Sequence, residues 1–424
     1  MLVFYKRYLW IVCFCFITPL KAQTLLTLES ASTTALSENP NLAQINARLQ
    51  AMQAIIPQRG ALPDPEISFN ALNLPVDSFD IGQENMTQMQ FGITQKIPFP
   101  TKLALREQVA TDERKVVVES LNEARLQLVS DVKQQWWLIF YLDRVLNIID
   151  STQILLRQFV EIARTKYEVG EGLQQDVLLA QLELSKLLDQ KLIWNSQREK
   201  AVAALNTLLN LPANQVIVLP DTVVAAFKKL RAENQLYQQA QQFRAALASG
   251  QQQVQVAKSR LQLAEEELYP DFKIGAFYGG RDDTLQGNRR DDFLSMKLSV
   301  TVPIFADSKQ NKAIQQRKAE VLQSVYALQD LWNQVRKQIS TAYSDYRRST
   351  QQIELFEKGI IPQARQTVAS MLSGYQVNQV DFLNLVRSEI TLFNYEMQYW
   401  HSFVQAHQAL ATLNAVVGQE SLYE

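Results

Sequence analysis

The sequence has almost no cysteine. Among its 424 residues the only two are Cys13 and Cys15, and both lie in a short apolar run that follows Lys6 and Arg7. A basic start, an apolar run of this length and a small residue before the cleavage point are typical of a secretory signal peptide, so we expect residues 1–22 to be removed. The mature chain would hold no thiol, which excludes disulfides and thiolate metal sites.

The sequence also lacks an excess of charge and a long apolar run. The formal net charge is −1, and it becomes −4 when Lys6, Arg7 and Lys21 leave with the signal peptide. A charge this small does not indicate a polyanionic partner, so we expect no nucleic acid binding. After residue 22 no stretch reaches the roughly 18 consecutive apolar residues of a transmembrane helix. A mature chain that enters a membrane must therefore do so as strands.

Residue groups that carry catalysis or bind metals are missing as well. His401 and His407 are six positions apart, so they do not share a helix face as a metal-binding pair would. We read them as core or surface residues. No grouping of acid, base and nucleophile is visible, and no motif resembles a nucleotide or proton site. The sequence predicts no enzyme, no cofactor and no metal site.

Glycine and proline are scarce at 13 each, whereas Gln, Ala and Leu are abundant, which favours long helices. Residues 102–168 contain neither Gly nor Pro, and a helix of that length extends about 100 Å. The matching segment from Ala306 to Gln376 contains Pro362, which we expect to kink or break it. Apolar residues in the first segment recur in the steps of three and four that coiled-coil packing requires, at positions 139, 142, 146, 149, 156, 160, 163 and 167.

Short landmarks recur in the same order at nearly constant spacing, which indicates an internal duplication. The predicted units are residues 23–215 and 216–424. Each is expected to contain a helix, a strand hairpin and a helical hairpin. The landmark pairs are Leu-Pro-Asp at 62–64 with Tyr-Pro-Asp at 269–271, Ile97-Pro98 with Val302-Pro303, Tyr167 with Tyr375, and Leu-Asn-Thr-Leu at 205–208 with Leu-Ala-Thr-Leu at 410–413.

The predicted strand hairpins cover residues 65–97 and 271–303, and the helical hairpins cover 102–210 and 306–416. Residues 42–59 read as the helix of the first unit, after a break at Asn39-Pro40. Apolar and polar residues alternate along the strands, most clearly from Leu294 to Val302. Strands of about ten residues with one apolar face match the length of transmembrane strands. The alternative is that each hairpin packs its apolar face on a soluble core.

Lipid does not tolerate an open sheet edge, and four strands are too few, because the smallest natural barrels have about eight. Three copies of the chain would supply 12 strands. Barrel closure therefore predicts association of several chains.

Four stretches carry a resemblance to a known family: P-D-P-E-I-S-F at 63–69, Q-K-I-P-F-P at 95–100, Tyr-x-Val-Gly at 167–170 and V-D-F-L at 380–383. With the duplication, they make the chain similar to the TolC family of outer-membrane efflux ducts over essentially its whole mature length. The residues around the first two stretches are most similar to those of the heavy-metal-efflux branch of that family.

The resemblance implies a mainly α fold with a transmembrane β-barrel, assembled as a homotrimer. A 12-stranded barrel in outer-membrane lipid would continue into a periplasmic tunnel of coiled-coil helices. The implied partners are a periplasmic adaptor (membrane fusion) protein and an inner-membrane pump of the RND type, which delivers drugs or metal ions to a passive duct. The alternatives are a type I secretion duct and a secreted coiled-coil protein that never enters a membrane.

The family also implies roles for the two helix-to-helix turns. The periplasmic tips that the adaptor contacts would include Val169, Gly170, Leu173, Val377 and Asn378. Gly170 and Asn378 suit the left-handed conformation that such turns need. The alternative is that both are ordinary helical turns without further function.

A pore constriction would form where Asp381, three residues before Asn384 on one helix face, repeats around a threefold axis. Converging Asp381 carboxylates would attract cations and have raised pKa values. A latch of the closed state would join Tyr375, Gln175 and Asp176. The family's arginine in this latch has no counterpart, because the second turn reads as three residues shorter than the first.

Overall fold

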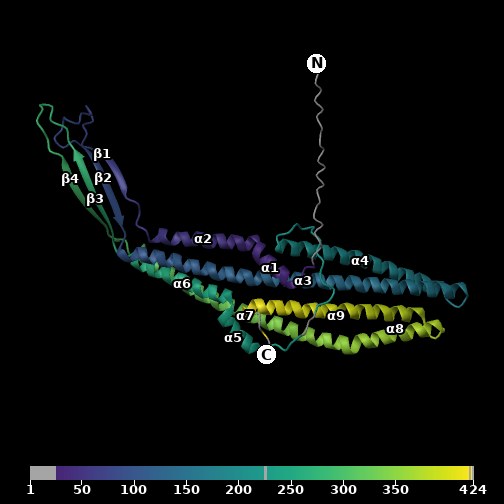
Figure 1. Cartoon of the computed structure of the whole chain (residues 1–424). Helices are drawn as coiled ribbons and strands as arrows, with labels where there is room; N and C mark the ends of the chain where they lie inside the picture. Colours follow the sequence, from purple (N-terminus) through teal and green to yellow (C-terminus); the bar gives the residue numbers. More distant parts are fainter. Residues whose placement is uncertain (1–24, 224–226, 420–421, 423–424) are drawn as a thin grey trace, which may run out of the picture.

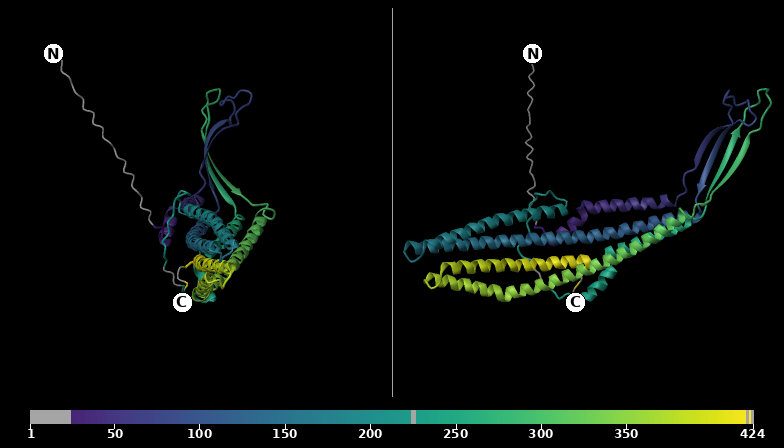
Figure 2. Two further views of the ribbon diagram at one scale, coloured as in Figure 1. Left: turned by 90° about the vertical axis from the view of Figure 1, so that its right-hand side faces the viewer. Right: turned by 180° about the vertical axis from the view of Figure 1, so that it is seen from behind.

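The computed structural model describes residues 25–223, 227–419 and 422, and the predicted signal peptide at 1–22 lies outside them. The molecule is long and narrow, with a small sheet at one end and long helices along the rest (Figure 1). Two helix-to-helix turns lie at the end opposite the sheet, as the view from behind also shows (Figure 2). The two ends are therefore separated by the full length of the longest helices.

Both halves of the chain follow the same order of elements. The first half contains α1 (Leu28–Glu38), α2 (Pro40–Gly60), β1 (Glu66–Leu72), β2 (Gln88–Ile97), α3 (Pro100–Glu168) and α4 (Gln174–Leu208). The second contains α5 (Glu233–Phe243), α6 (Ala245–Glu266), β3 (Asp271–Gly280), β4 (Phe293–Thr301), α7 (Gln310–Leu355), η1 (Phe356–Ile360), α8 (Ile361–Gln376) and α9 (Phe382–Val417). The predicted strand pairs and long helices are confirmed, whereas the short helix α1 was not predicted.

Local chemistry explains the break between α1 and α2. The Asn39 side chain accepts hydrogen bonds from the backbone N–H groups of Asn41 (3.0 Å) and Leu42 (3.4 Å). Pro40 follows as the first residue of α2, where its missing N–H costs no hydrogen bond. The break predicted at Asn39-Pro40 is therefore an N-cap that starts α2.

Pro362 distorts its helix without ending it. The five residues Phe356–Ile360 form a π-helix (η1), and α8 continues directly from it. A proline ring presses on the carbonyl four residues earlier, here that of Lys358, and a widened turn relieves this clash. The prediction that Pro362 disturbs its helix is confirmed, but the alternative of a complete break is wrong.

The four strands form one antiparallel sheet in the order β1-β2-β3-β4. The register aligns Phe69 with Phe91, Phe91 with Tyr278, and Tyr278 with Leu294, so these four side chains share one face. The pairing of β2 with β3 joins the two halves of the chain. Within the chain β1 and β4 are edge strands, each with one side unpaired.

One face of the sheet is apolar and exposed. Met296 is 86% exposed, and its neighbours on the face include Ile67, Phe69, Ile93, Leu294 and Leu298. The opposite face carries mainly Lys, Gln, Ser and Thr side chains together with glycine positions, for example Lys96 beside Lys273. The predicted alternation is confirmed, but no layer of the described chain covers the apolar face. The alternative prediction, that the hairpins pack on a core within the same chain, is wrong.

The hydrophobic core lies in the helical part, where α3 packs against α4, α6 and α9. Trp136 and Trp137 are buried there, and the Trp136 indole N–H donates to the carbonyl of Leu26 at 2.9 Å. Of the eight predicted coiled-coil positions, Ile139, Leu142, Ile149, Leu156 and Ala163 are buried. The prediction is wrong for Tyr167, which is 47% exposed at the end of α3 and does not pack in the core.

Within the described ranges, none of the helices combines the length and the apolar character that a membrane crossing takes.

Candidate functional site

The first helix-to-helix turn depends on one glycine. Gly170 has a φ of +79°, and a Cβ there would meet nothing within 4 Å, so the backbone conformation and not space selects glycine. The amides of Glu171 and Gly172 both donate to the carbonyl of Lys166, at 2.8 and 3.0 Å. These bonds satisfy the Lys166 carbonyl near the end of α3 and turn the chain back into α4.

The second turn uses Asn378 in the same role, with a φ of +60°. Its amide donates to the carbonyl of Tyr375 at 3.2 Å, and the amide of Gln379 donates to that of Gly374 at 2.9 Å. Asn is the residue after glycine that best tolerates this conformation. The prediction that Gly170 and Asn378 adopt the left-handed conformation is confirmed.

The two turns have the same length, which corrects the prediction of a shorter second turn. Residues 169–173 separate α3 from α4, and residues 377–381 separate α8 from α9. Position 173 of the first turn thus corresponds to Asp381, and Asp176 corresponds to Asn384. The acids differ in position along equal turns: Asp381 is the N-cap of α9, whereas Asp176 lies in the first turn of α4.

Tyr375 and Asp176 meet between the two helical hairpins of one chain. The Tyr375 hydroxyl donates to Asp176 Oδ2 at 3.4 Å, and the Tyr375 ring packs against Phe382 at a centroid distance of 5.0 Å. Tyr375 is 5% exposed. Gln175, the third predicted latch residue, is exposed, and its side chain forms no hydrogen bond with the described residues.

A lysine that the sequence reading missed completes this contact. Lys166 of α3 is 8% exposed, donates a hydrogen bond to Asn378 Oδ1, and lies 4.9 Å from the centre of the Tyr375 ring. The family's latch arginine has no counterpart on the second hairpin. Lys166, on the first hairpin, places a cation at this contact instead. The only sequence signal is its position one residue before Tyr167, because a lysine in a polar helix is ordinarily solvated.

Burial and charge shift the acid–base properties of this contact. Desolvation raises the pKa of Asp176, and the nearby Asp381 carboxylate raises it further, although the Tyr375 hydrogen bond opposes both. Burial, together with the Asp176 carboxylate, raises the pKa of Tyr375 to about 12. The Tyr375 hydroxyl therefore keeps its proton at neutral pH and remains a hydrogen-bond donor.

The other predicted site residues lie on the outside of the single chain. Asp381 and Asn384 are both exposed, one turn apart at the start of α9, and neither contacts the Tyr375 pair through a hydrogen bond. The turn tips expose apolar side chains, with Val169, Leu173 and Val377 between 58% and 65% exposed. These surfaces are open to another chain.

Glu389 is a buried acid, two turns beyond Asp381 on α9. It is 3% exposed, and its Oε2 has no hydrogen-bond partner among the described residues. Burial, with a smaller effect of the Glu396 carboxylate, raises the pKa of Glu389 from 4.5 to about 7. The carboxyl is therefore protonated in the folded chain over a pH range in which it is ionised in the unfolded chain.

Because the pKa of Glu389 is raised, we expect the stability of the folded chain to depend on pH. Because the folded state holds the extra proton, stability decreases as the pH rises from about 4.5 to about 7. Glu389→Gln should remove this loss and stabilise the chain by roughly 3 kcal/mol above pH 7, with little gain below pH 4.5. Thermal melts at pH 4.5 and 8 would measure it, with the exposed Glu161→Gln as control. An equal effect of Glu389→Gln at both pH values would contradict the assignment.

The histidines pack against aromatic side chains, with His407 half-buried and His401 exposed. The His407 ring stacks on Trp137 at 3.8 Å between centroids, and burial lowers the pKa of His407 to about 4. His401 contacts the Tyr141 ring edge-on at 5.6 Å. Among the residues that the structure describes, no group of three or more His, Cys, Asp or Glu side chains is arranged to hold a metal ion.

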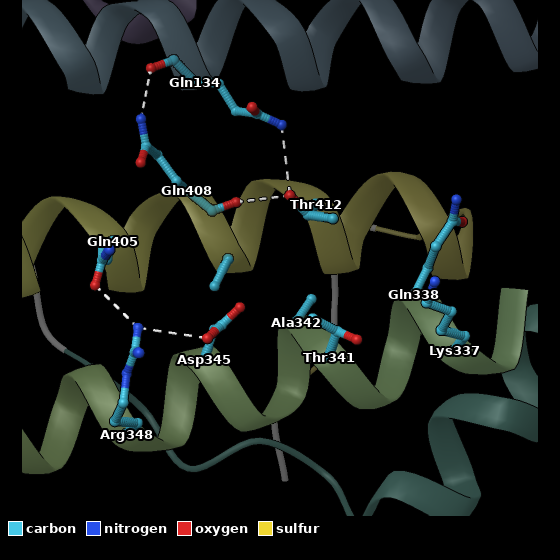
Figure 3. A pocket seen from close by; sticks show the side chains of 11 residues that line it. Gln134, Lys337, Gln338, Thr341, Ala342, Asp345, Arg348, Gln405, Gln408 and Thr412 are labelled. Carbon is cyan, nitrogen blue, oxygen red and sulfur yellow. Dashed lines mark hydrogen bonds and ion pairs between the residues drawn. The ribbon is translucent and has the colours of Figure 1, made fainter. Parts of the chain in front are cut away.

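A polar groove of about 600 Å³ lies midway along the helices, between α3, α7 and α9 (Figure 3). Several of its side chains form hydrogen bonds within the groove. Gln134 donates to Thr412 at 3.4 Å, Gln408 donates to the Gln134 carbonyl at 3.0 Å, and Arg348 donates to Gln405 at 3.0 Å. The groove is lined mainly by polar side chains, and none of its lining residues belongs to the predicted latch, constriction or turn tips.

Comparison with known proteins identifies the fold. The model of the family described as "Outer membrane efflux protein" matches residues 31–211 and 236–419. The chain belongs to this family. It is an outer-membrane efflux channel, and its long helices form the periplasmic part.

Individual relatives are distant in sequence but similar over their whole length. The cobalt-zinc-cadmium resistance protein CzcC of Cupriavidus metallidurans is 19% identical, over 95% of this chain and 92% of that protein. The outer-membrane channel OprN has a TM-score of 0.79 at 14% identity, over 92% of this chain and 89% of that one. VceC of Vibrio cholerae has a TM-score of 0.77 at 17% identity, over 93% and 97%.

Proposed function

We propose that three copies of this efflux channel close a 12-stranded barrel and form the exit duct of a tripartite pump. The observation that carries the proposal is the sheet, with an exposed apolar face and two unpaired edges, β1 and β4. In lipid the apolar face is stable, but unpaired backbone groups at the edges are not. Pairing β4 of one chain with β1 of the next satisfies both requirements.

The helices support association too. Leucines on the outer side of α4 remain exposed along several turns, namely Leu178, Leu182, Leu188 and Leu192. An apolar stripe of this kind on a helix in water is stable when another helix covers it. Helices of neighbouring copies would cover it in a closed tunnel.

The Tyr375 contact is the proposed latch of the closed duct. Tyr375 with Asp176, and Lys166 with Asn378, join the two helical hairpins of each chain at the periplasmic end. Gln175 stays a candidate for a contact with a neighbouring copy. Opening would be a rigid-body shift of one hairpin once these bonds break. No residue of this contact performs chemistry, so transport energy would come from the pump and the chain would not act as an enzyme.

Asp381 is the proposed constriction, with Asn384 beside it. Three copies would bring three Asp381 carboxylates to one axis, where they attract divalent cations. Asp381→Ala should raise the half-blocking concentration of Co²⁺ in a planar bilayer by roughly tenfold or more, since each carboxylate removed contributes on the order of 1 kcal/mol. Asn384→Asp, the matched variant, should lower it. Unchanged block in both variants would remove these residues from the pore.

The turn tips are the proposed adaptor contact. Val169, Gly170, Leu173, Val377 and Asn378 form an exposed, partly apolar end suited to a periplasmic adaptor that connects to an inner-membrane pump of the RND type. The relative CzcC favours divalent metal ions as cargo over drugs.

Deletion of the gene tests the cargo. We expect sensitivity to cobalt, zinc and cadmium that the intact gene restores. Sensitivity to drugs alone would leave the duct in place and contradict the metal cargo. Recovery of the protein in the soluble periplasmic fraction without detergent would contradict the duct itself.

A further inference from the structure

A basic groove lies where the helices meet the sheet. Its volume is about 570 Å³, and it is lined by the end of α2, the start of α3, the end of α6 and the start of α7. In Figure 1 these helices run into the strands at this level. The groove is thus far from both helical turns and has no part in the proposed gate.

Five cationic side chains line the groove against two acids, in a chain whose net charge is only −1. Arg106 pairs with Glu267 at 3.3 Å, and Arg260 pairs with Glu113 at 2.5 Å. Arg317 pairs with Glu320, which lies outside the groove, at 2.6 Å. The remaining two cations, Arg59 and Lys309, have no carboxylate partner among the described residues.

The groove also contains a helix N-terminus and an apolar floor. Lys309 is the N-cap of α7, so the N–H end of that helix adds positive potential beside its ammonium group, although the Asn311 N–H already donates to the carbonyl of Ala306. Val109, Ala110, Leu263 and Ala264 form the floor between α3 and α6. A ligand that fits this surface has an anionic head and a part that tolerates apolar contact.

We propose that this groove binds a phosphate group, with Arg59 and Lys309 as its principal contacts. Arginine offers a planar fork that matches two phosphate oxygens, and lysine adds a point charge. The chemistry suits the phosphodiester of an anionic phospholipid and also a free phosphate. Exposed apolar side chains beside the strand ends, Tyr269, Ile304 and Phe305, favour the lipid.

The lipid source rests on the proposed function, because only insertion of the sheet brings the groove to the headgroup layer. That layer adds roughly 5–8 Å to each side of the hydrocarbon core. The groove begins within one or two helical turns of the strand ends, which matches this depth. Binding of a free phosphate, by contrast, requires no membrane.

The test uses the purified full-length assembly in detergent. Native mass spectrometry would count phosphatidylglycerol and phosphatidylethanolamine bound per assembly, and calorimetry would measure inorganic pyrophosphate. Arg59→Ala with Lys309→Ala should weaken binding of the preferred probe by roughly a hundredfold, about tenfold for each charge-assisted hydrogen bond that the variant removes. The matched control is Lys312→Ala with Lys318→Ala, which removes two exposed cations from the same region of α7 outside the groove.

Preferential binding of phosphatidylglycerol that the double variant loses and the control keeps would support the lipid source. The same pattern with pyrophosphate alone would support a soluble phosphate. Equal binding by the wild type, the variant and the control would overturn the site. So would an assembly that dissociates only in the double variant, because the cations would then pair with acids of a second copy. The number of chains and the conductance are measured separately, so loss of the duct is distinguishable from loss of the site.

Discussion

The double variant Tyr375→Phe with Asp176→Ala is expected to increase the single-channel conductance of the duct severalfold. Tyr375 is buried and donates to Asp176 across the two hairpins, so the change removes this bond from each of three copies. At roughly 1 kcal/mol per bond, the closed state loses about 3 kcal/mol, which shifts the balance between closed and open by roughly a hundredfold. Planar-bilayer recordings measure the effect directly.

The chain offers a matched control for this experiment. Tyr167 holds the corresponding position at the first turn, but it is 47% exposed and forms no hydrogen bond with the described residues through its hydroxyl. Tyr167→Phe should leave the conductance unchanged. Lys166→Met should open the duct as the double variant does, because Lys166 holds Asn378 and the Tyr375 ring. A closed, wild-type conductance in both latch variants would show that the contact does not hold the gate.

Met296→Arg is expected to abolish assembly in the outer membrane. Met296 is 86% exposed in the middle of β4, on the apolar face of the sheet. An arginine at the centre of a lipid-facing strand costs about 2–4 kcal/mol in each chain, and three chains share one barrel. The measured quantity is the amount of assembled protein in the outer-membrane fraction.

Ser295→Arg is the control for that variant. Ser295 is the preceding residue on β4, and its side chain lies on the polar face opposite Phe277. In a barrel that face borders the lumen, so the arginine stays hydrated and assembly should be close to normal. Equal loss of assembly in both variants would indicate a general folding defect and would contradict the assignment of a lipid-facing side.

The regular parts of the fold were predictable because they depend on periodicity. Alternation along residues 294–302 determined which face of β4 is apolar, and the absence of Gly and Pro from residues 102–168 predicted α3 almost to its ends. The position of a proline limits a helix but does not determine how the helix adjusts. The π-helix before Pro362 depended on packing and was therefore not predictable from that residue.

The site was only partly predictable. Tyr375, Asp176, Gly170 and Asn378 followed from motifs, and the structure brings the first two together. Lys166 was missed because its burial depends on how close the two hairpins lie, and that distance could not be predicted from the sequence. The turn lengths were misjudged because they were counted between acids, and the acids hold different positions on equal turns.

The most direct test of the proposed barrel is a disulfide scan between the two sheet edges. Both natural cysteines lie at positions 13 and 15, within the predicted signal peptide, so introduced thiols report without background. One cysteine on β1 and one on β4 lie at opposite edges of the sheet and are not neighbours within a chain. If three copies close a barrel, oxidation in native membranes should give covalent species of two and three chains at registers that pair β4 with the next β1. Single chains at every register would contradict the barrel.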